Sequence, residues 1–322
     1  MKQIKFPIIT TLLVAFLTAG CATAKTEPTA SQPQSSPQQK QEDVQKQFQV
    51  IVSQAHEARE VTAFLDKTIG TVDAQTADKL FIALQDYYQH LLPNVNESFT
   101  MLLHQPGTVQ KLYDLGPPYD FTKIKGDDKV KKWLMAQQAG KLALGVTYDE
   151  SFYWKVDVHA LKQVYASYLS PEMKTYLDIL VTADQPFLVD GGLKITRNEL
   201  GDRLVAVEQY LTEYPAGQKK AEMKAMYADY LNAFIHEYRY DAIDLGTLKL
   251  LPQVKQSYER FVKEHPTTKT AQIINAYMAE LTKNEDVIYS PGKKGASISG
   301  DPKANIAQFW NGLGKEVDRL FP

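Results

Sequence analysis

The residue types that could do chemistry gather in Lys141–Asp157, which reads KLALGVTYDESFYWKVD. Acidic residues flank aromatic residues in this stretch, and a second acidic position follows at Asp190, beside the short extended piece PFLVDGGLKI. Aromatic faces with nearby carboxylates suit sugar rings, and two well-spaced carboxylates could hydrolyse a glycan. If the two stretches come together, they form one ligand groove, for which the candidate residues are Tyr148, Glu150, Tyr153, Trp154, Asp157 and Asp190. The other interpretation is that the acids are solvated in turns and the rings pack on the core.

The histidines do not have the spacing of a metal site. No two of them share a helix face at ligand spacing, and the chain has no H-E-x-x-H motif. The pairs His236-Glu237 and Glu264-His265 are adjacent residues, which do not face each other on a helix. We therefore expect no metal ligand among the histidines, which are His56, His90, His104, His159, His236 and His265.

Nucleophile and phosphate motifs are incomplete as well. The segment Gly295–Ser299 has serine where the last glycine of G-x-S-x-G should stand, and no clear strand precedes it. Gly292-Lys293-Lys294 lacks the order of a phosphate-binding loop. The sequence therefore predicts no catalytic residue, no cofactor and a non-enzymatic protein.

Apolar residues at helical spacing predict that most of the chain is helical. One such face carries Leu80, Leu84 and Tyr87, and we expect Pro93 to end that helix. Ser170-Pro171 has the pattern of an N-cap followed by proline at the first helical position. A capping box is predicted at Thr196 and Glu199. Further helical faces follow in 158–168, 173–180, 200–211 and 223–234. A final amphipathic helix carries Phe309, Trp310, Leu313, Val317 and Leu320.

Two short segments interrupt the helices. Residues 141–157 predict an inserted β-hairpin, with the polar break at Asp149–Ser151 as its turn. Gly191-Gly192 predicts a tight turn between two extended pieces in 186–195. Residues 290–303 are rich in Gly, Ser and Lys, and we expect a loop there. The expected fold is therefore mainly α: an irregular helical-hairpin domain with a small inserted β-hairpin and a disordered N-terminal tether.

A weak internal repeat lies in 204–283. EQYLTEYPAGQKKAEMKAMY, from Glu208, is echoed by ERFVKEHPTTKTAQIINAYM, from Glu259, and the prolines Pro215 and Pro266 are 51 positions apart. Each copy resembles the helix-turn-helix unit of tetratricopeptide-like proteins, which include lipoproteins that scaffold envelope assembly machines. The copies depart from that family in period, which is about 34 residues there. The alternative is two similarly built helical hairpins in an irregular domain.

Residues Thr147–Thr282 also resemble an uncharacterised class of bacterial exported proteins. The shared features are the aromatic hairpin, an S-P-E helix, a D-G-x-L-x-I turn and the helices with E-x-[YF]-[LV]-x-E-x-P. This resemblance implies export and a helical fold, and it implies no activity.

The N-terminus has the marks of a secretory signal: Lys2 and Lys5, then a short apolar core, then small residues. The core is too short to span a bilayer as a mature helix. Leu17–Cys21, LTAGC, resembles the lipobox of bacterial lipoproteins. The resemblance implies that residues 1–20 are removed and that Cys21, the single cysteine, carries a diacylglyceryl anchor. It leaves no thiol for a disulfide, a nucleophile or a zinc site.

Residues 21–45 are rich in Thr, Pro, Ser, Gln and Lys, a composition that cannot bury enough apolar surface to fold. We interpret this segment as a tether of lipidated Cys21, with a mean span of about 25–30 Å. The whole chain has a formal charge of −2, and loss of Lys2 and Lys5 makes it more acidic. Nucleic acid is therefore not an expected partner.

The expected organisation is a helical region over 46–140 and a helical domain over 141–322, which holds the hairpin and the tetratricopeptide-like pairs. The expected location is the outer face of a bacterial cell membrane, or the periplasmic or outer-membrane face if the cell is Gram-negative. The leading hypothesis is a lipid-anchored protein-interaction or scaffold protein, whose helical pairs should expose a large apolar patch. The alternative is an extracytoplasmic module that binds a solute or the cell-wall glycan through a pocket where Tyr153, Trp154 and Asp190 converge.

Overall fold

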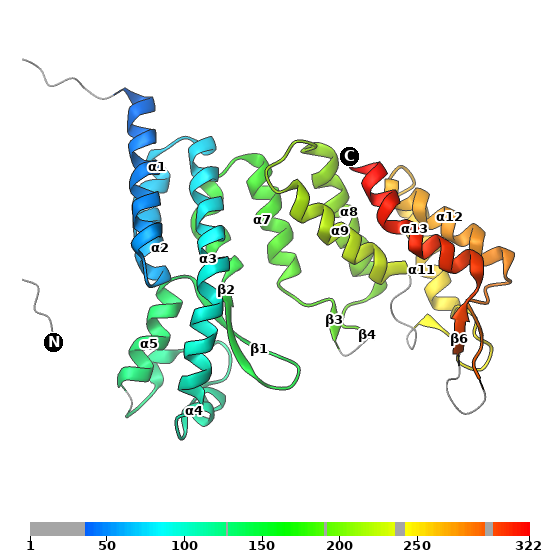
Figure 1. Cartoon of the computed structure of the whole chain (residues 1–322), viewed down its shortest axis with the longest axis horizontal. Coiled ribbons are helices and arrows are strands. Elements are labelled where there is room, and N and C mark those ends of the chain that lie inside the picture. Colours follow the sequence, from blue (N-terminus) through cyan, green and yellow to red (C-terminus); the bar gives the residue numbers. More distant parts are fainter. Residues whose placement is uncertain (1–35, 127, 190–191, 236–241, 294–298) are drawn as a thin grey trace, which may run out of the picture.

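The computed structural model describes residues 36–126, 128–189, 192–235, 242–293 and 299–322. Helices stand side by side in one long row, from α1 at one end to α11, α12 and α13 at the other (Figure 1). The strands of the described residues form small two-stranded antiparallel sheets beside the helices. The prediction of a mainly helical fold with a small inserted hairpin is therefore confirmed.

The first described helix begins earlier than the sequence predicts. Ser36 accepts a hydrogen bond from the backbone N–H of Gln39 at 3.2 Å, and proline occupies the first helical position. The helix packs through Phe48, which is fully buried. A disordered tether up to residue 45 is thus wrong for 37–45, because core contacts stabilise a helix there; Cys21 lies outside the described residues. The helices of this end are α1 (Pro37–Gln54), α2 (Ala58–Thr68), η1 (Ile69–Thr71) and α3 (Ala74–Leu103).

The helix α3 does not end at Pro93, as predicted, but continues to Leu103. Proline has no N–H, so the carbonyl of Gln89 loses its helical donor. Val95 and Phe99 lie beyond the proline and are buried. Burial of these side chains offsets the lost hydrogen bond, and apolar contacts outside the helix therefore override the local signal.

The predicted β-hairpin is present, and it packs on the N-terminal helices. The backbone N–H of Trp154 donates to the Asn96 side chain at 2.7 Å, and the Asn96 amide donates to the Trp154 carbonyl at 3.0 Å. The hairpin, predicted as part of 141–322, thus makes these contacts with helices of the 46–140 region. The elements here are α4 (Thr108–Leu115), η2 (Phe121–Lys123), α5 (Asp128–Ala139), β1 (Leu142–Val146) and β2 (Phe152–Val156).

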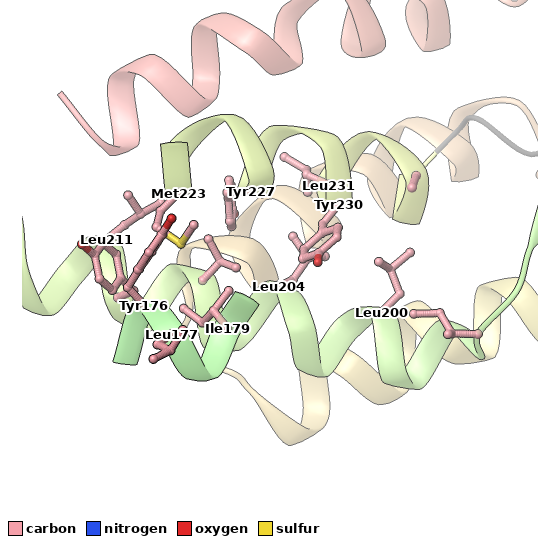
Figure 2. Packing of buried hydrophobic residues seen from close by; sticks show 14 of the residues in the cluster. Tyr176, Leu177, Ile179, Leu200, Leu204, Leu211, Met223, Tyr227, Tyr230 and Leu231 are labelled. Atoms are coloured by element: carbon pink, nitrogen blue, oxygen red, sulfur yellow. The ribbon is translucent and has the colours of Figure 1, made fainter. Parts of the chain in front are cut away.

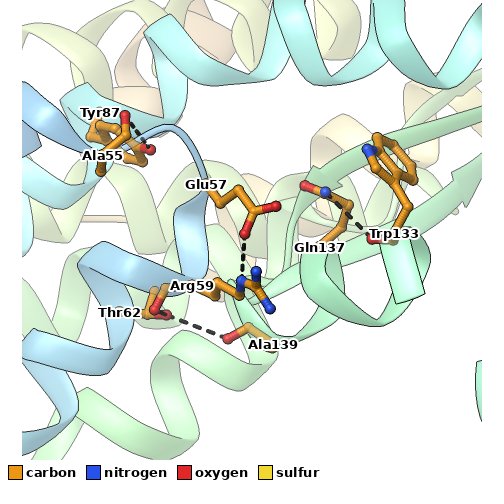
Figure 3. A network of polar contacts seen from close by, with 8 residues as sticks. All are labelled: Ala55, Glu57, Arg59, Thr62, Tyr87, Trp133, Gln137 and Ala139. Carbon is orange, nitrogen blue, oxygen red and sulfur yellow. Dashed lines mark hydrogen bonds and ion pairs between the residues drawn. The ribbon is translucent and has the colours of Figure 1, made fainter. Parts of the chain in front are cut away.

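Polar contacts join the start of α2 to the end of α5 and to α3 (Figure 3). The Thr62 hydroxyl donates to the Ala139 carbonyl at 3.3 Å, and the Tyr87 hydroxyl donates to the Ala55 carbonyl at 3.5 Å. Glu57 and Arg59 form an ion pair beside them. Helices that are distant in sequence are therefore tied at the turn between α1 and α2.

The middle of the row confirms two local predictions. The Ser170 hydroxyl accepts from the Met173 N–H at 3.3 Å, with Pro171 at the first helical position. Leu188 pairs with Leu193 in a short hairpin whose turn, 190–191, lies outside the described residues. The elements are α6 (Val158–Tyr165), η3 (Ala166–Tyr168), α7 (Pro171–Ala183), β3 (Leu188–Val189) and β4 (Gly192–Leu193).

Both copies of the weak repeat fold as helix-turn-helix pairs. The predicted capping box at Thr196 and Glu199 opens the first pair. Apolar side chains of α7, α8 and α9, including Tyr176, Leu204 and Tyr227, interdigitate in a closely packed interior (Figure 2). The pairs are α8 (Arg197–Glu213) with α9 (Lys220–Ile235), and α11 (Pro252–Glu264) with α12 (Lys269–Lys283).

The last helix, α13 (Ala304–Leu320), packs against α9 and α12. Its apolar face is as predicted, with Leu313 and Val317 buried. The predicted loop at 290–303 is wrong at its two ends, where backbone pairing forms β5 (Tyr289–Pro291) and β6 (Ser299–Pro302); residues 294–298 lie outside the described part. Buried apolar residues form one continuous cluster from Phe48 to Phe321.

Candidate functional site

The hairpin register separates the two central aromatic residues of the predicted groove. Tyr153 pairs with Gly145 and Trp154 pairs with Leu144, and successive residues of a strand point to opposite faces. Trp154 is 1% exposed and its ring packs against Phe99, with centroids 5.8 Å apart. Tyr153 lies on the other face, where its ring covers Gly145. Trp154 is therefore a core residue, as the alternative interpretation of the sequence allowed.

The remaining groove candidates serve local structure or lie elsewhere. The Asp157 carboxylate accepts from the Ala160 N–H at 2.9 Å and so caps α6. Glu150 occupies the hairpin turn with a φ of 63°, and Tyr148 is 76% exposed at the same tip. Asp190 lies outside the described residues. The described members of the predicted groove therefore do not line one cavity.

The hairpin tip is held in one shape by its own side chains. The Thr147 hydroxyl contacts Asp149 and accepts from the Ser151 N–H at 2.9 Å. The Ser151 hydroxyl donates to the Asp149 carboxylate at 3.2 Å. Hydrogen bonds from Thr147 and Ser151 lower the pKa of Asp149, so this carboxylate keeps its negative charge at mildly acidic pH. The tip therefore presents Tyr148 on a well-defined, negatively charged turn.

Helix α4 packs beside this tip and extends its apolar surface. The Tyr113 hydroxyl donates to the Glu150 carbonyl at 2.8 Å, and the Tyr113 ring contacts Phe152, with centroids 4.9 Å apart. Val146 pairs with Phe152 across the hairpin and is 42% exposed. Val109 lies one turn before Tyr113 on the same helix face. We call the exposed residues Val109, Tyr113, Val146 and Tyr148 the distal patch.

Carboxylates border the distal patch. Asp114, Asp149 and Glu150 are exposed around it. Among the described residues, no ion pair joins any of the three to a lysine or arginine. An apolar surface bordered by unneutralised carboxylates favours a partner surface that is apolar with a basic border.

The distal patch lies at the opposite end of the bundle from the point where the chain enters it. Helices α1 and α3 run parallel: Gln41 and Gln45 contact Thr76 near the start of α3, and Ala55 contacts Tyr87 farther along. The helix α3 is 30 residues long, or about 45 Å, and it delivers α4 to its far end (Figure 1). The patch is therefore directed away from residue 36.

The predicted apolar patch on the helical pairs is wrong. Within the described residues of 204–283, Leu245, at 38%, is the only large apolar residue that is exposed, and it lies in the connection between the pairs. The other large apolar side chains of these helices pack against neighbouring helices. The sequence analysis missed Val109 and Tyr113, although their spacing of four residues in a short segment between Gly107 and Gly116 was a usable signal.

The described residues contain neither a metal-ligand cluster nor a membrane-spanning helix. Outside the gaps in the structure, no group of three or more His, Cys, Asp or Glu residues could hold a metal ion. None of the helices described combines the length and apolar character needed to cross a bilayer. The chain matches no family model, no curated protein and no solved structure.

Proposed function

We propose that this chain is a lipid-anchored protein of the bacterial cell envelope that binds another envelope protein through the distal patch. The observation that carries the binding role is the grouping of Tyr113, Val146 and Tyr148 at one end of the bundle, on a rigid turn with a carboxylate border. Contiguous exposed apolar groups of this kind mark interaction sites. The expected partner has an apolar surface with a basic border.

Anchoring rests on the lipobox at Leu17–Cys21. Residues 22–36, 15 in number, connect Cys21 to the start of α1 as a linker. Because α1 begins at the end of the bundle nearest to this linker, the distal patch faces away from the lipid surface. Such an orientation favours a protein partner in the aqueous space over a lipid one.

Site-specific photocrosslinking in the native envelope tests the binding role. We expect a discrete crosslinked product when the photocrosslinker p-benzoylphenylalanine replaces Tyr148. The matched control is Tyr168, which is 43% exposed and contacts Gly70 at the opposite end of α3. The double variant Asp149→Lys, Glu150→Lys should remove the product at position 148. Equal products at both sites, no product at position 148, or a product unaffected by charge reversal would each contradict the proposal.

A separate experiment tests the anchor. Cys21→Ser should move the protein from the membrane fraction to the soluble fraction and abolish labelling by radioactive palmitate. Tyr148→Ser is the matched control and should leave both unchanged. Tight membrane association of Cys21→Ser would contradict anchoring through this residue.

The alternative of a solute- or glycan-binding module on the hairpin loses its support, because Tyr153 and Trp154 lie on opposite faces of the sheet and Asp157 caps a helix. We do not propose it further.

A further inference from the structure

A cleft of about 490 Å³ lies between the first turn of α8 and the first half of α11. The apolar side chains of Leu193, Ile195 and Val254 line part of it. Small-molecule sites in proteins typically have volumes of about 300–1,000 Å³ and combine apolar surface with a few polar groups. The cleft therefore has the size and mixed lining of a ligand site.

The packing of α8 on α11 explains why the cleft is open. The two helices touch at Gly201, where a Cβ atom would come within 2.9 Å of the Phe261 ring. One turn earlier on α8, the facing residues are polar and exposed, namely Asn198 on α8 and Gln253 and Gln256 on α11. The helices are therefore in close contact at Gly201. One turn earlier the facing side chains are polar and do not pack together, which leaves the cleft open there.

The charge of the lining is one-sided. Arg197 and Arg260 line the cleft, and none of the described residues in its lining is an aspartate or glutamate. The acids of the same helices are placed elsewhere: Glu199 bonds Thr196, Glu264 bonds the Nε of Arg260, and Asp202 and Glu259 are exposed outside the lining. An anion entering the cleft therefore meets guanidinium and amide donors.

The groove between α12 and α13 shows the contrast. It has a volume of about 680 Å³, and its lining holds acids and bases together. These charges pair with one another, Lys283 with Glu280 at 2.5 Å and Arg319 with Glu316 at 2.5 Å. That groove presents both signs of charge to a ligand, whereas the acid that pairs with Arg260, Glu264, lies outside the described lining of the α8–α11 cleft.

We propose that the α8–α11 cleft binds the carboxylate of a small amphipathic anion, such as an acylated amino acid or the C-terminus of a peptide. The terminal nitrogens of Arg260 can bind a carboxylate bidentately, because its bond to Glu264 uses Nε. Arg197, which donates to the Phe234 carbonyl at 2.9 Å, is held at the opposite wall. The apolar body of the ligand packs on Leu193 and Val254. This site is independent of the distal patch.

The test compares N-acetyl-leucine with N-acetyl-leucinamide, which differ only in the carboxylate, on the full chain carrying Cys21→Ser. The readout is the methyl NMR signals of Leu193, Ile195 and Val254. We expect saturable shifts with the acid at a Kd of about 1 mM, and binding of the amide at least about tenfold weaker. Added salt should weaken binding of the acid.

Arg260→Gln should weaken acid binding by about tenfold or more. Its side chain is 55% exposed, so the variant is expected to fold. Arg319→Gln, in the α12–α13 groove, is the matched control and should bind the acid normally. Equal binding of acid and amide, no saturable shift up to about 20 mM ligand, or unchanged binding by Arg260→Gln would each overturn the proposal.

Discussion

In the N-terminal bundle, aromatic rings hold the hairpin β1–β2 against the helices, whereas in the helical pairs a carboxylate from an earlier helix holds each turn. Trp154 stands at the centre of the first arrangement, with Phe99, Trp133 and Phe121 around it at centroid distances of 5.8, 6.1 and 5.8 Å. Its indole Nε1 is buried without a hydrogen-bond partner among the described residues. The ring of Trp154 is therefore held by apolar packing, while its backbone exchanges two hydrogen bonds with the Asn96 side chain.

The turns of the pairs are held by Glu172 and Glu208. The Glu172 carboxylate accepts from the Gln218 N–H at 2.7 Å, and the Glu208 carboxylate accepts from the Lys269 N–H at 2.6 Å. Gln218 and Lys269 follow Pro215 and Pro266 by three residues each, so the two bonds occur at equivalent positions of the repeat. The weak sequence repeat thus corresponds to a repeated way of fixing the turn of each pair to an earlier helix, α7 for the first pair and α8 for the second.

The two regions differ in how many residues share each stabilising interaction. Apolar packing has no preferred direction and involves many neighbours, so the sequence does not show which apolar residues are in contact. Hydrogen bonds to helix N-termini are directional and need particular groups at particular places. Four changes test this comparison.

Trp154→Ala should produce the largest effect. Removing this buried ring leaves a cavity among three aromatic side chains, and we expect a loss of about 3–5 kcal/mol in the free energy of unfolding. Denaturant unfolding followed by circular dichroism measures it. Tyr148→Ala, at the exposed tip of the same hairpin, is the control and should change stability by less than about 0.5 kcal/mol. A loss below about 1 kcal/mol for Trp154→Ala would contradict the central role of this ring.

Glu208→Ala should be next. Glu208 is 6% exposed and accepts from the N–H groups of both Lys269 and Thr270, the second at 2.9 Å. Removing it leaves these donors buried without a partner, at a cost of about 2–3 kcal/mol. Glu172→Ala should cost less, about 1–2 kcal/mol, because water can reach the exposed Gln218, although the buried Tyr210 hydroxyl also loses its acceptor. Equal losses for the two variants would show that burial does not distinguish the two contacts.

Alkaline pH should destabilise the protein through its buried tyrosines. The Tyr88 hydroxyl donates to the Gly140 carbonyl at 2.8 Å, and burial raises the pKa of Tyr88 above its ordinary value of 10.0. Because the folded-state pKa is the higher one, the contribution is fully present below pH 10 and falls as pH rises above it. One such group changes stability by about 1.4 kcal/mol per pH unit.

Tyr88→Phe isolates that contribution. Between pH 10 and 11 the variant should lose about 1 kcal/mol less stability than the unchanged protein, as measured by denaturant unfolding at each pH. Tyr148→Phe, at the exposed tip, should behave as the unchanged protein does. Parallel losses in all three proteins would show that Tyr88 does not control the alkaline transition.

Thr196→Ala should have the smallest effect. The Thr196 hydroxyl accepts from the Glu199 N–H at 3.1 Å at the start of α8, and loss of such a cap costs about 1 kcal/mol. Thermal or denaturant unfolding measures the loss. Thr182→Ala is the control, because the exposed Thr182 hydroxyl only donates to the Asp178 carbonyl within α7. If Thr182→Ala lost as much stability as Thr196→Ala, the capping explanation would be refuted.

The sequence by itself determined the features that depend on residues close to one another in the chain. The caps at Ser170 and Thr196, the hairpin at 141–157 and the two helix-turn-helix pairs all follow from such local interactions. Tertiary structure alone decided the rest. The bonds of Trp154 to Asn96 and of Glu208 to Thr270 join residues 58 and 62 positions apart, and the burial of Val95 and Phe99 carries α3 past Pro93. Packing against distant helices decides which acidic or aromatic side chain faces water and which is buried. For this reason the described residues form no groove at Tyr153 and Trp154, where the sequence predicted one, and the structure instead exposes a patch at Tyr113 and Tyr148.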